Sequence, residues 1–191
     1  MNRHAVQLIS RGAITKIGNM LYDYGNSVWL ASMGTIGKTV LGIYQISELV
    51  TGILVNPFGG VISDRFSRRK ILMTTDLVCG LLCLAISFIR NDRWMIAALI
   101  VANIVQAIAF GFSRPANKAI ITEVVEKDEI VTYNAHLELV LQVVSVGSPV
   151  FSFLVLQFAS LHATLLLDAL TFFIAFVLVA FLPKEVAKVQ E

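Results

Sequence analysis

Charged side chains are scarce in this sequence of 191 residues, of which only 15% are Asp, Glu, Lys or Arg. Soluble domains carry about 25% charged and about 45–50% apolar residues. Here 57% of the residues are hydrophobic, and the mean hydropathy is +0.77. Because a chain this apolar cannot cover its surface with polar groups, the composition excludes a soluble domain and predicts an integral membrane protein.

Cysteine is equally scarce, with Cys79 and Cys83 as the two in the chain. No second pair of Cys or His residues would complete a zinc site, because His4, His136 and His162 are scattered. A nucleophile–base set and a phosphate-binding glycine loop are missing too. We therefore expect no enzyme, no metal and no cofactor, and we interpret the two cysteines as small packing residues.

Three further absences narrow the class of protein to which this sequence can belong. Tracts rich in Gly-Pro or in Gln and Asn are missing, which excludes a low-complexity chain. Residues 1–11 have no continuous apolar run and no cleavage site after it, so no secretory signal is expected. Short alternating strands, which a membrane barrel would need, are not present.

Six stretches are long enough to cross a hydrocarbon core of about 30 Å, which takes about 20 helical residues each. They are residues 12–34, 39–62, 71–90, 94–113, 133–159 and 163–182. Helices are expected because every backbone N–H and C=O group in lipid must be satisfied within its own segment. The predicted fold class is all-α, a polytopic membrane protein with one six-helix domain over residues 1–191.

The connection after the fourth stretch predicts a short interfacial helix over about 115–126. Ser113 precedes Pro115, which favours a helix start. Apolar residues then recur at helical spacing against acidic ones, which is typical of a helix lying on a membrane surface. An ordinary surface connection remains the alternative.

Lys and Arg residues predict the orientation, because they concentrate on the cytoplasmic side of membrane proteins. With the N-terminus inside, only Lys38, Arg90 and Arg93 of the 15 basic residues lie outside. Trp29 and Trp94 then fall at the outer interface, where aromatic belts occur. We expect a multi-pass protein of the cell membrane with both termini cytoplasmic. Its net charge of +2 reflects this topology and does not indicate a nucleic-acid partner.

Polar side chains share one face on four of the predicted helices. Ionisable groups inside a bilayer usually face a cavity or a partner. The residues are Asn19, Asp23 and Asn26 on the first helix, Tyr44 and Glu48 on the second, Asn103 and Gln106 on the fourth, and Glu138, Gln142 and Ser145 on the fifth. Such stripes also serve as contacts between helices, but four of them with three carboxylates favour a shared aqueous cavity for substrate and protons. Helices 71–90 and 163–182 are nearly all apolar and are interpreted as lipid-side supports.

Two pairs of acidic residues indicate a faint internal repeat. The separation along the chain between Glu48 and Glu138 is almost the same as that between Asp76 and Asp168. The two members of each pair lie at mirrored depths in the membrane. An inverted three-plus-three repeat would place them so.

The segment "GGVISDRFSRRKIL" resembles the loop signature of the major facilitator superfamily, G-x-L-A-D-R-x-G-R-R-x-x-L, between the second and third helices. Ser67 stands where the family prefers Gly. The segments "KIGNMLYDYG", "SRPANKAIITEVVEKDEIVTYNA" and "LLLDALTFFIAF" resemble the branch of macrolide-efflux proteins and the enterobactin exporter. The residues that match or nearly match the signature are Gly60, Ile62, Ser63, Asp64, Arg65, Arg68, Arg69 and Leu72.

The resemblance implies a conformational latch in this loop. The latch residues are Gly60, Asp64, Arg65, Arg68, Arg69 and Asp76. Gly60 would let the second helix pack closely on a neighbour, and Asp64 would face the N-terminal end of a helix in another half. The arginines would pair with carboxylates such as Asp76 or bind anionic lipid headgroups. A positive anchor that only sets topology is the alternative. Gly147 and Pro149, near the place of the antiporter Gly-Pro pair, are expected to form a hinge in the fifth helix.

The resemblance also implies a function. We expect the N-terminal half of a proton-coupled efflux antiporter of the inner membrane, exporting a drug-like or siderophore-like compound, as in multidrug resistance. Its partners would be lipid, the small-molecule substrate, and a C-terminal six-helix half or a second copy. The chain stops at "LPKEVAKVQE", where a central linker should begin. A non-transporting scaffold or assembly module built on the same unit is the alternative function.

Overall fold

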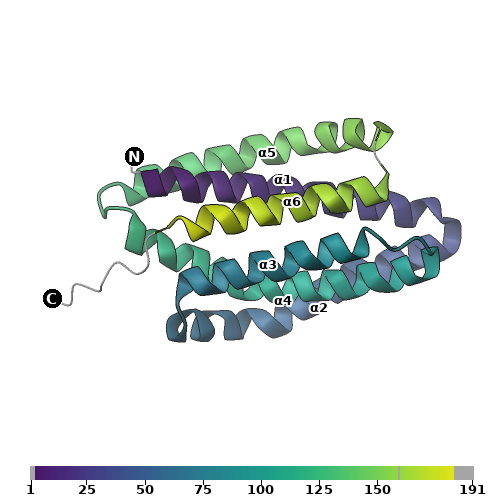
Figure 1. Ribbon diagram of the computed structural model, residues 1–191, viewed down its shortest axis with the longest axis horizontal. Coiled ribbons are helices and arrows are strands. Elements are labelled where there is room, and N and C mark those ends of the chain that lie inside the picture. The colour runs from purple at the N-terminus through teal and green to yellow at the C-terminus, as the bar shows by residue number, and fades with distance from the viewer. Residues whose placement is uncertain (1–2, 159, 183–191) are drawn as a thin grey trace.

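The computed structural model describes residues 3–158 and 160–182, which form six helices lying side by side along one long axis (Figure 1). The helices are α1 (Arg3–Ser32), α2 (Gly34–Arg65), α3 (Arg68–Ile86), α4 (Asp92–Val124), α5 (Ile130–Phe158) and α6 (Leu161–Ala180). No strand occurs in these ranges. The all-α expectation is therefore confirmed, and residues from 183 onward, where a linker was expected, lie outside the described part.

The expected boundaries differ from the observed ones, most at the start of the first helix and at the end of the fourth. The first helix begins at Arg3, nine positions before the expected start, because Ala5, Leu8 and Ile9 are buried in a core cluster and extend its apolar face. The turn from α1 to α2 is short, and Gly34 adopts a left-handed φ of 74°. Glycine suits this turn because it has no Cβ to clash in that conformation.

The separate interfacial helix expected over 115–126 is wrong, because α4 continues through Pro115 to Val124. Proline costs one backbone hydrogen bond, but its fixed φ is close to the helical value. The apolar face of this last segment does not lie free on a surface. Ala116, Ile120 and Ile121 are buried in the same core cluster as the start of α1.

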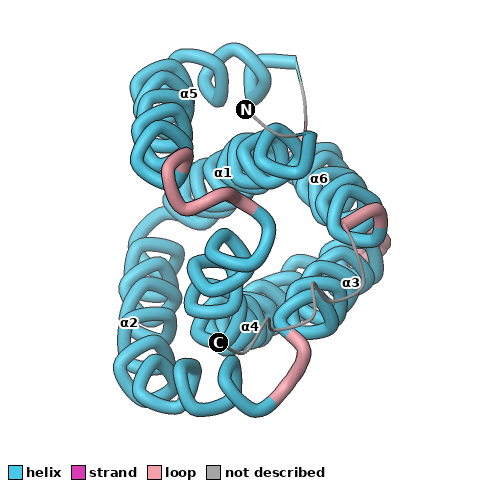
Figure 2. The backbone as a smooth tube through the Cα atoms, turned by 90° about the vertical axis from the view of Figure 1, so that its left-hand side faces the viewer, coloured by secondary structure: helices cyan, strands magenta, loops and turns pink. Residues whose placement is uncertain are grey.

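Helix packing has a two-fold pattern, which Figure 2 shows in a view along the helices. Helix α2 packs on α4 as α5 packs on α1, and α3 packs on α4 as α6 packs on α1. Helices α3 and α6 pack on each other. Exchanging α1, α2 and α3 with α4, α5 and α6 therefore reproduces the principal contacts.

Four helices are long and apolar enough to cross a membrane by length and composition within the described ranges. They are α2, α4, residues Ile130–Gly147 of α5, and α6. Helix α1 is more polar because it carries Arg11, Lys16 and Asp23, and α3 begins with three basic residues. A multi-pass membrane protein is thus supported, while six spans remain a prediction.

Candidate functional site

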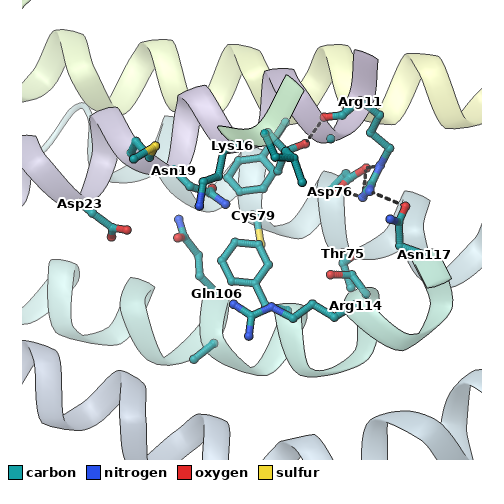
Figure 3. A pocket seen from close by; sticks show the side chains of 18 of the residues that line it. Arg11, Lys16, Asn19, Asp23, Thr75, Asp76, Cys79, Gln106, Arg114 and Asn117 are labelled. Atoms are coloured by element: carbon teal, nitrogen blue, oxygen red, sulfur yellow. Dashed lines mark hydrogen bonds and ion pairs between the residues drawn. The ribbon is translucent and has the colours of Figure 1, made fainter. Parts of the chain in front are cut away.

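A cavity of about 380 Å³ lies among the helices (Figure 3). A second hollow of about 380 Å³ between α2 and α4 shares Glu48, Phe110 and Arg114 with it. The two hollows therefore adjoin at these residues. The cavity is lined by Arg11, Gly12, Thr15, Lys16, Asn19, Met20, Asp23, Glu48, Thr75, Asp76, Cys79, Asn103, Gln106, Ala107, Phe110, Ser113, Arg114, Asn117, Leu137, Leu141 and Phe172.

Helix α1 presents its polar face to the cavity. Thr15, Asn19 and Asp23 follow one another at steps of four residues, which places them on one side of a helix. The side-chain oxygen of Asn19 is buried and has no hydrogen-bond partner among the described residues. The cavity wall thus holds a buried acceptor without a partner among the described residues.

One end of the cavity carries carboxylates. The Tyr44 hydroxyl accepts a hydrogen bond from Asn26 Nδ2 at 3.2 Å and donates one to Asp23 Oδ1 at 3.4 Å. Asn103 Nδ2 donates to the Tyr44 carbonyl oxygen at 2.7 Å. These bonds tie α1, α2 and α4 together around Asp23. Glu48, one helical turn after Tyr44, adds the second carboxylate of the site.

The other end is held by a buried ion pair, shown on the right of Figure 3. Arg11 Nη2 donates to Asp76 Oδ1 at 2.8 Å, and Arg11 Nε donates to Asp76 Oδ2 at 3.1 Å. Arg11 Nη1 donates to Asn117 Oδ1 at 3.2 Å. Arg11 is 7% exposed and Asp76 is 3% exposed. This clamp joins α1, α3 and α4.

Between the two ends lie cations and aromatic rings. The Arg114 guanidinium stands over the Phe110 ring at 5.8 Å from its centroid. Phe110 also stacks on Phe172, with 6.4 Å between the ring centroids. Lys16 lines the cavity beside them (Figure 3). The site therefore combines flat apolar walls with separated acidic and basic groups.

Comparison with known proteins shows the family of the chain. The sequence model of the Major Facilitator Superfamily matches residues 12–191. The chain belongs to this family.

One named protein is similar to this chain, but at low sequence identity and over part of its length. The arabinose-proton symporter of Bacillus subtilis (strain 168) is 28% identical over 113 residues, which cover 56% of this chain and 24% of the symporter. The chain thus spans about a quarter of the length of this relative. The family supports a membrane protein. The likeness to macrolide-efflux proteins and the enterobactin exporter stays a prediction.

The signature loop of this major facilitator chain makes contacts that the sequence did not indicate. Arg69 donates to the carbonyl oxygens of Val179 and Ala180, which caps the end of α6. Arg68 pairs with Glu123 of α4. The expected pairing of these arginines with Asp76 is wrong, because Arg11 from α1 occupies both carboxylate oxygens.

Asp64 and Arg65 behave differently from the other latch residues. Both are exposed, and neither forms an ion pair or a side-chain hydrogen bond with the described residues. Gly60 is exposed as well, and a Cβ there would meet nothing within 4 Å among the described residues, so close packing at Gly60 stays a prediction. Gly59 makes that approach instead, since a Cβ there would collide with the carbonyl oxygen of Gly111 in α4.

The polar stripe of α5 does not reach the cavity. Glu138 and Gln142 are exposed and hydrogen-bond each other at 3.0 Å, and Ser145 is half-buried away from the lining. Helix α5 lines the cavity with Leu137 and Leu141 instead. The stripe marks a polar face correctly, but helical period alone does not say what that face meets.

Gly147 and Pro149 are exposed within a continuous α5, so their role as a hinge stays a prediction.

Helices α3 and α6 are more than lipid-side supports, and that interpretation is wrong. Thr75, Asp76 and Cys79 of α3 and Phe172 of α6 line the cavity. Sequence reasoning also missed Arg11, although it lies one turn before Thr15 on the polar face of α1. That shared face was the available signal.

Proposed function

We propose that this chain is the N-terminal six-helix half of a secondary transporter that exports an amphipathic drug-like or siderophore-like compound in exchange for protons. The proposal depends on the cavity, which is lined by the carboxylates of Asp23 and Glu48 and by the stacked rings of Phe110 and Phe172. A cationic amphipath would place its charge at the carboxylates and its apolar part on the rings. Burial disfavours the charged form of a carboxyl group, so substrate and proton would compete for one site.

Alternating access in such carriers is a rocking of repeats or bundles around a central site. The two-fold pattern of helix contacts supports a three-plus-three repeat. Six spans in the cell membrane with both termini cytoplasmic belong to the proposal, on the distribution of Lys and Arg. The remaining wall of the site would come from a C-terminal half or from a second copy.

The latch remains part of the proposal. Because Asp64 is exposed and has no partner among the described residues, it is available to a helix end in the other half. Asp64→Asn should keep expression but reduce export. Unchanged export at normal expression would leave loop 2–3 as a positive topology anchor.

A second candidate is proton-driven movement of a polyhydroxy solute. The likeness to an arabinose-proton symporter favours it. So do the side-chain amides of Asn19, Asn103, Gln106 and Asn117, which line the cavity and suit hydroxyl groups.

Reconstitution in proteoliposomes with an imposed proton gradient separates the candidates. We would offer two compounds, a lipophilic cationic dye and a radiolabelled pentose. The recipients are the full-length parent protein and its variants Asp23→Asn, Glu48→Gln and Glu138→Gln. The export proposal expects dye movement that the first two variants lose and that Glu138→Gln, outside the cavity, retains. Movement of the pentose alone supports the second candidate, and movement of neither leaves the scaffold alternative.

A further inference from the structure

Asp168, in the middle of α6, is a carboxyl group that the proposed transport site does not use. Its side chain is 0% exposed, and no ion pair joins it to a Lys or Arg among the described residues. A Cβ added to Gly18 of α1 would meet Asp168 Oδ1, so the carboxyl group lies directly against the backbone of that helix.

The neighbours of Asp168 come from every helix around it, and none of those that the structure describes is a cation. Thr171 Oγ1, on α6 itself, donates to the backbone carbonyl oxygen of Asp168 at 2.7 Å and lies 3.4 Å from Asp168 Oδ1. Cys83 Sγ, on α3, donates to Asp168 Oδ2 at 3.4 Å. The titratable and polar groups that face it are Tyr22 and Asp23 on α1, Cys79 and Cys83 on α3, and Gln106 on α4.

These surroundings favour a neutral carboxylic acid. An ionised carboxylate in an apolar interior is costly unless a cation or several hydrogen bonds compensate it. Asp76 has such a cation in Arg11, whereas among the described residues Asp168 has a thiol, a hydroxyl and the amide of Gln106 as its polar neighbours. Within a membrane protein, an ionisable group placed this way marks a functional site by default.

A short chain of polar groups connects Asp168 to the cavity. Gln106 lines the cavity, and its Nε2 donates to Cys83 Sγ at 3.1 Å. Cys83 in turn donates to Asp168. Cys79, one helical turn before Cys83, also lines the cavity. Asp168 therefore lies one layer of side chains behind the wall that substrate and water would touch.

We propose that Asp168 is a proton-binding site behind the transport cavity, which releases its proton to cavity water and takes one up again during each transport cycle. On release the acid O–H bond breaks, the proton passes to a water molecule of the cavity to give hydronium, and the carboxylate keeps its hydrogen bond from Cys83. Uptake reverses this step with no other bond changed. The proposal rests on the proton coupling proposed above and assigns it a second carboxyl group besides Asp23.

Infrared difference spectroscopy tests the site without relying on transport. Spectra of the purified protein in lipid would be compared between mildly acidic and mildly alkaline buffer. The parent should show the carbonyl stretch of a neutral carboxylic acid that disappears in alkaline buffer, and Asp168→Asn should lack that band. Cys83→Ser should shift the band, which assigns it even if Asp168→Asn fails to fold. Identical spectra for the parent, Asp168→Asn and Cys83→Ser would overturn the proposal.

Transport measurements give the second readout. With Asp168→Asn, uphill accumulation driven by a proton gradient should fall to the level reached without a gradient, while exchange of substrate across the membrane continues. Glu138→Gln is the control and should leave both unchanged. If Asp23→Asn abolishes coupling and Asp168→Asn does not, the Asp168 site is refuted and the proposed function stands. The infrared band assigned to Asp168 could disappear in alkaline buffer while the parent moves no protons with substrate. In that case the proposed function fails and only the proton-binding site remains.

Discussion

Asp76 and Asp168 occupy corresponding places in α3 and α6 and are almost equally buried, at 3% and 0% exposure, yet their surroundings are opposite. Asp76 is gripped by Arg11 through two guanidinium bonds. Asp168 meets a thiol, a hydroxyl and the backbone at Gly18. A buried cation stabilises a carboxylate, whereas its absence favours the neutral acid. One aspartate is therefore a fixed part of a clamp, and the other is free to change its protonation.

The largest expected effect on stability comes from removing the cation that pairs with Asp76. Arg11→Met leaves the Asp76 carboxylate buried without a partner and should lower the free energy of unfolding by about 3–5 kcal/mol. Thermal unfolding in detergent can be followed by thiol labelling, because Cys79 and Cys83 are free and buried in the folded protein. The double variant Arg11→Met/Asp76→Leu should recover much of the loss. Equal stability of the single variant and the parent would mean that the clamp contributes nothing.

The next largest expected effect on stability comes from disturbing the close packing around Asp168. Gly18→Ala should cost about 1–3 kcal/mol, because the new methyl group would press on Thr171 and Asp168 in a packed interior. Gly12→Ala is the control on the same helix, where only the tip of Leu137 lies within contact distance. It should be neutral or stabilising by up to about 1 kcal/mol. The two melting temperatures measure the difference, and equal shifts would argue against tight packing at Gly18.

Replacement of Asp168 itself should have a smaller effect on stability. Asp168→Asn exchanges one neutral hydrogen-bonding group for another of the same shape, so we expect a change of about 0.5–1.5 kcal/mol. Asp76→Asn, which strands the Arg11 charge, is the matched comparison and should cost several times more. A loss for Asp168→Asn as large as that for Asp76→Asn would indicate that Asp168 is ionised and compensated in the folded protein.

The smallest expected effect concerns the ion pair between Arg68 and Glu123. Their side chains are 22% and 33% exposed, so solvent screens the pair far more than it screens Arg11 and Asp76. Glu123→Gln should change the free energy of unfolding by about 0.2–1 kcal/mol, with less effect in high salt. Unfolding in low and high salt would check this. A larger, salt-independent loss would make this pair a second clamp.

The polar residues of the cavity show how far sequence reasoning reaches. The stripe of Asn19 and Asp23 on α1 was readable because helical period places such residues on one face, and the structure places both in the cavity lining. The same argument failed for Glu138, because a stripe does not reveal which neighbour its face meets. Glu138 lies exposed beside Gln142.

Composition and period by themselves determined that this is a membrane protein of long helices, because lipid requires each backbone polar group to be satisfied within its own segment. The signature loop determined the family, since its spacing of glycine, aspartate and arginines is local in sequence. Only the tertiary structure decided which charges meet. Arg11 reaches Asp76 across 65 positions of the chain, while Asp168 reaches Cys83 across 85 and meets no cation in the described part of the chain. Such pairings depend on helix order and rotation in the bundle, which local periodicity does not encode.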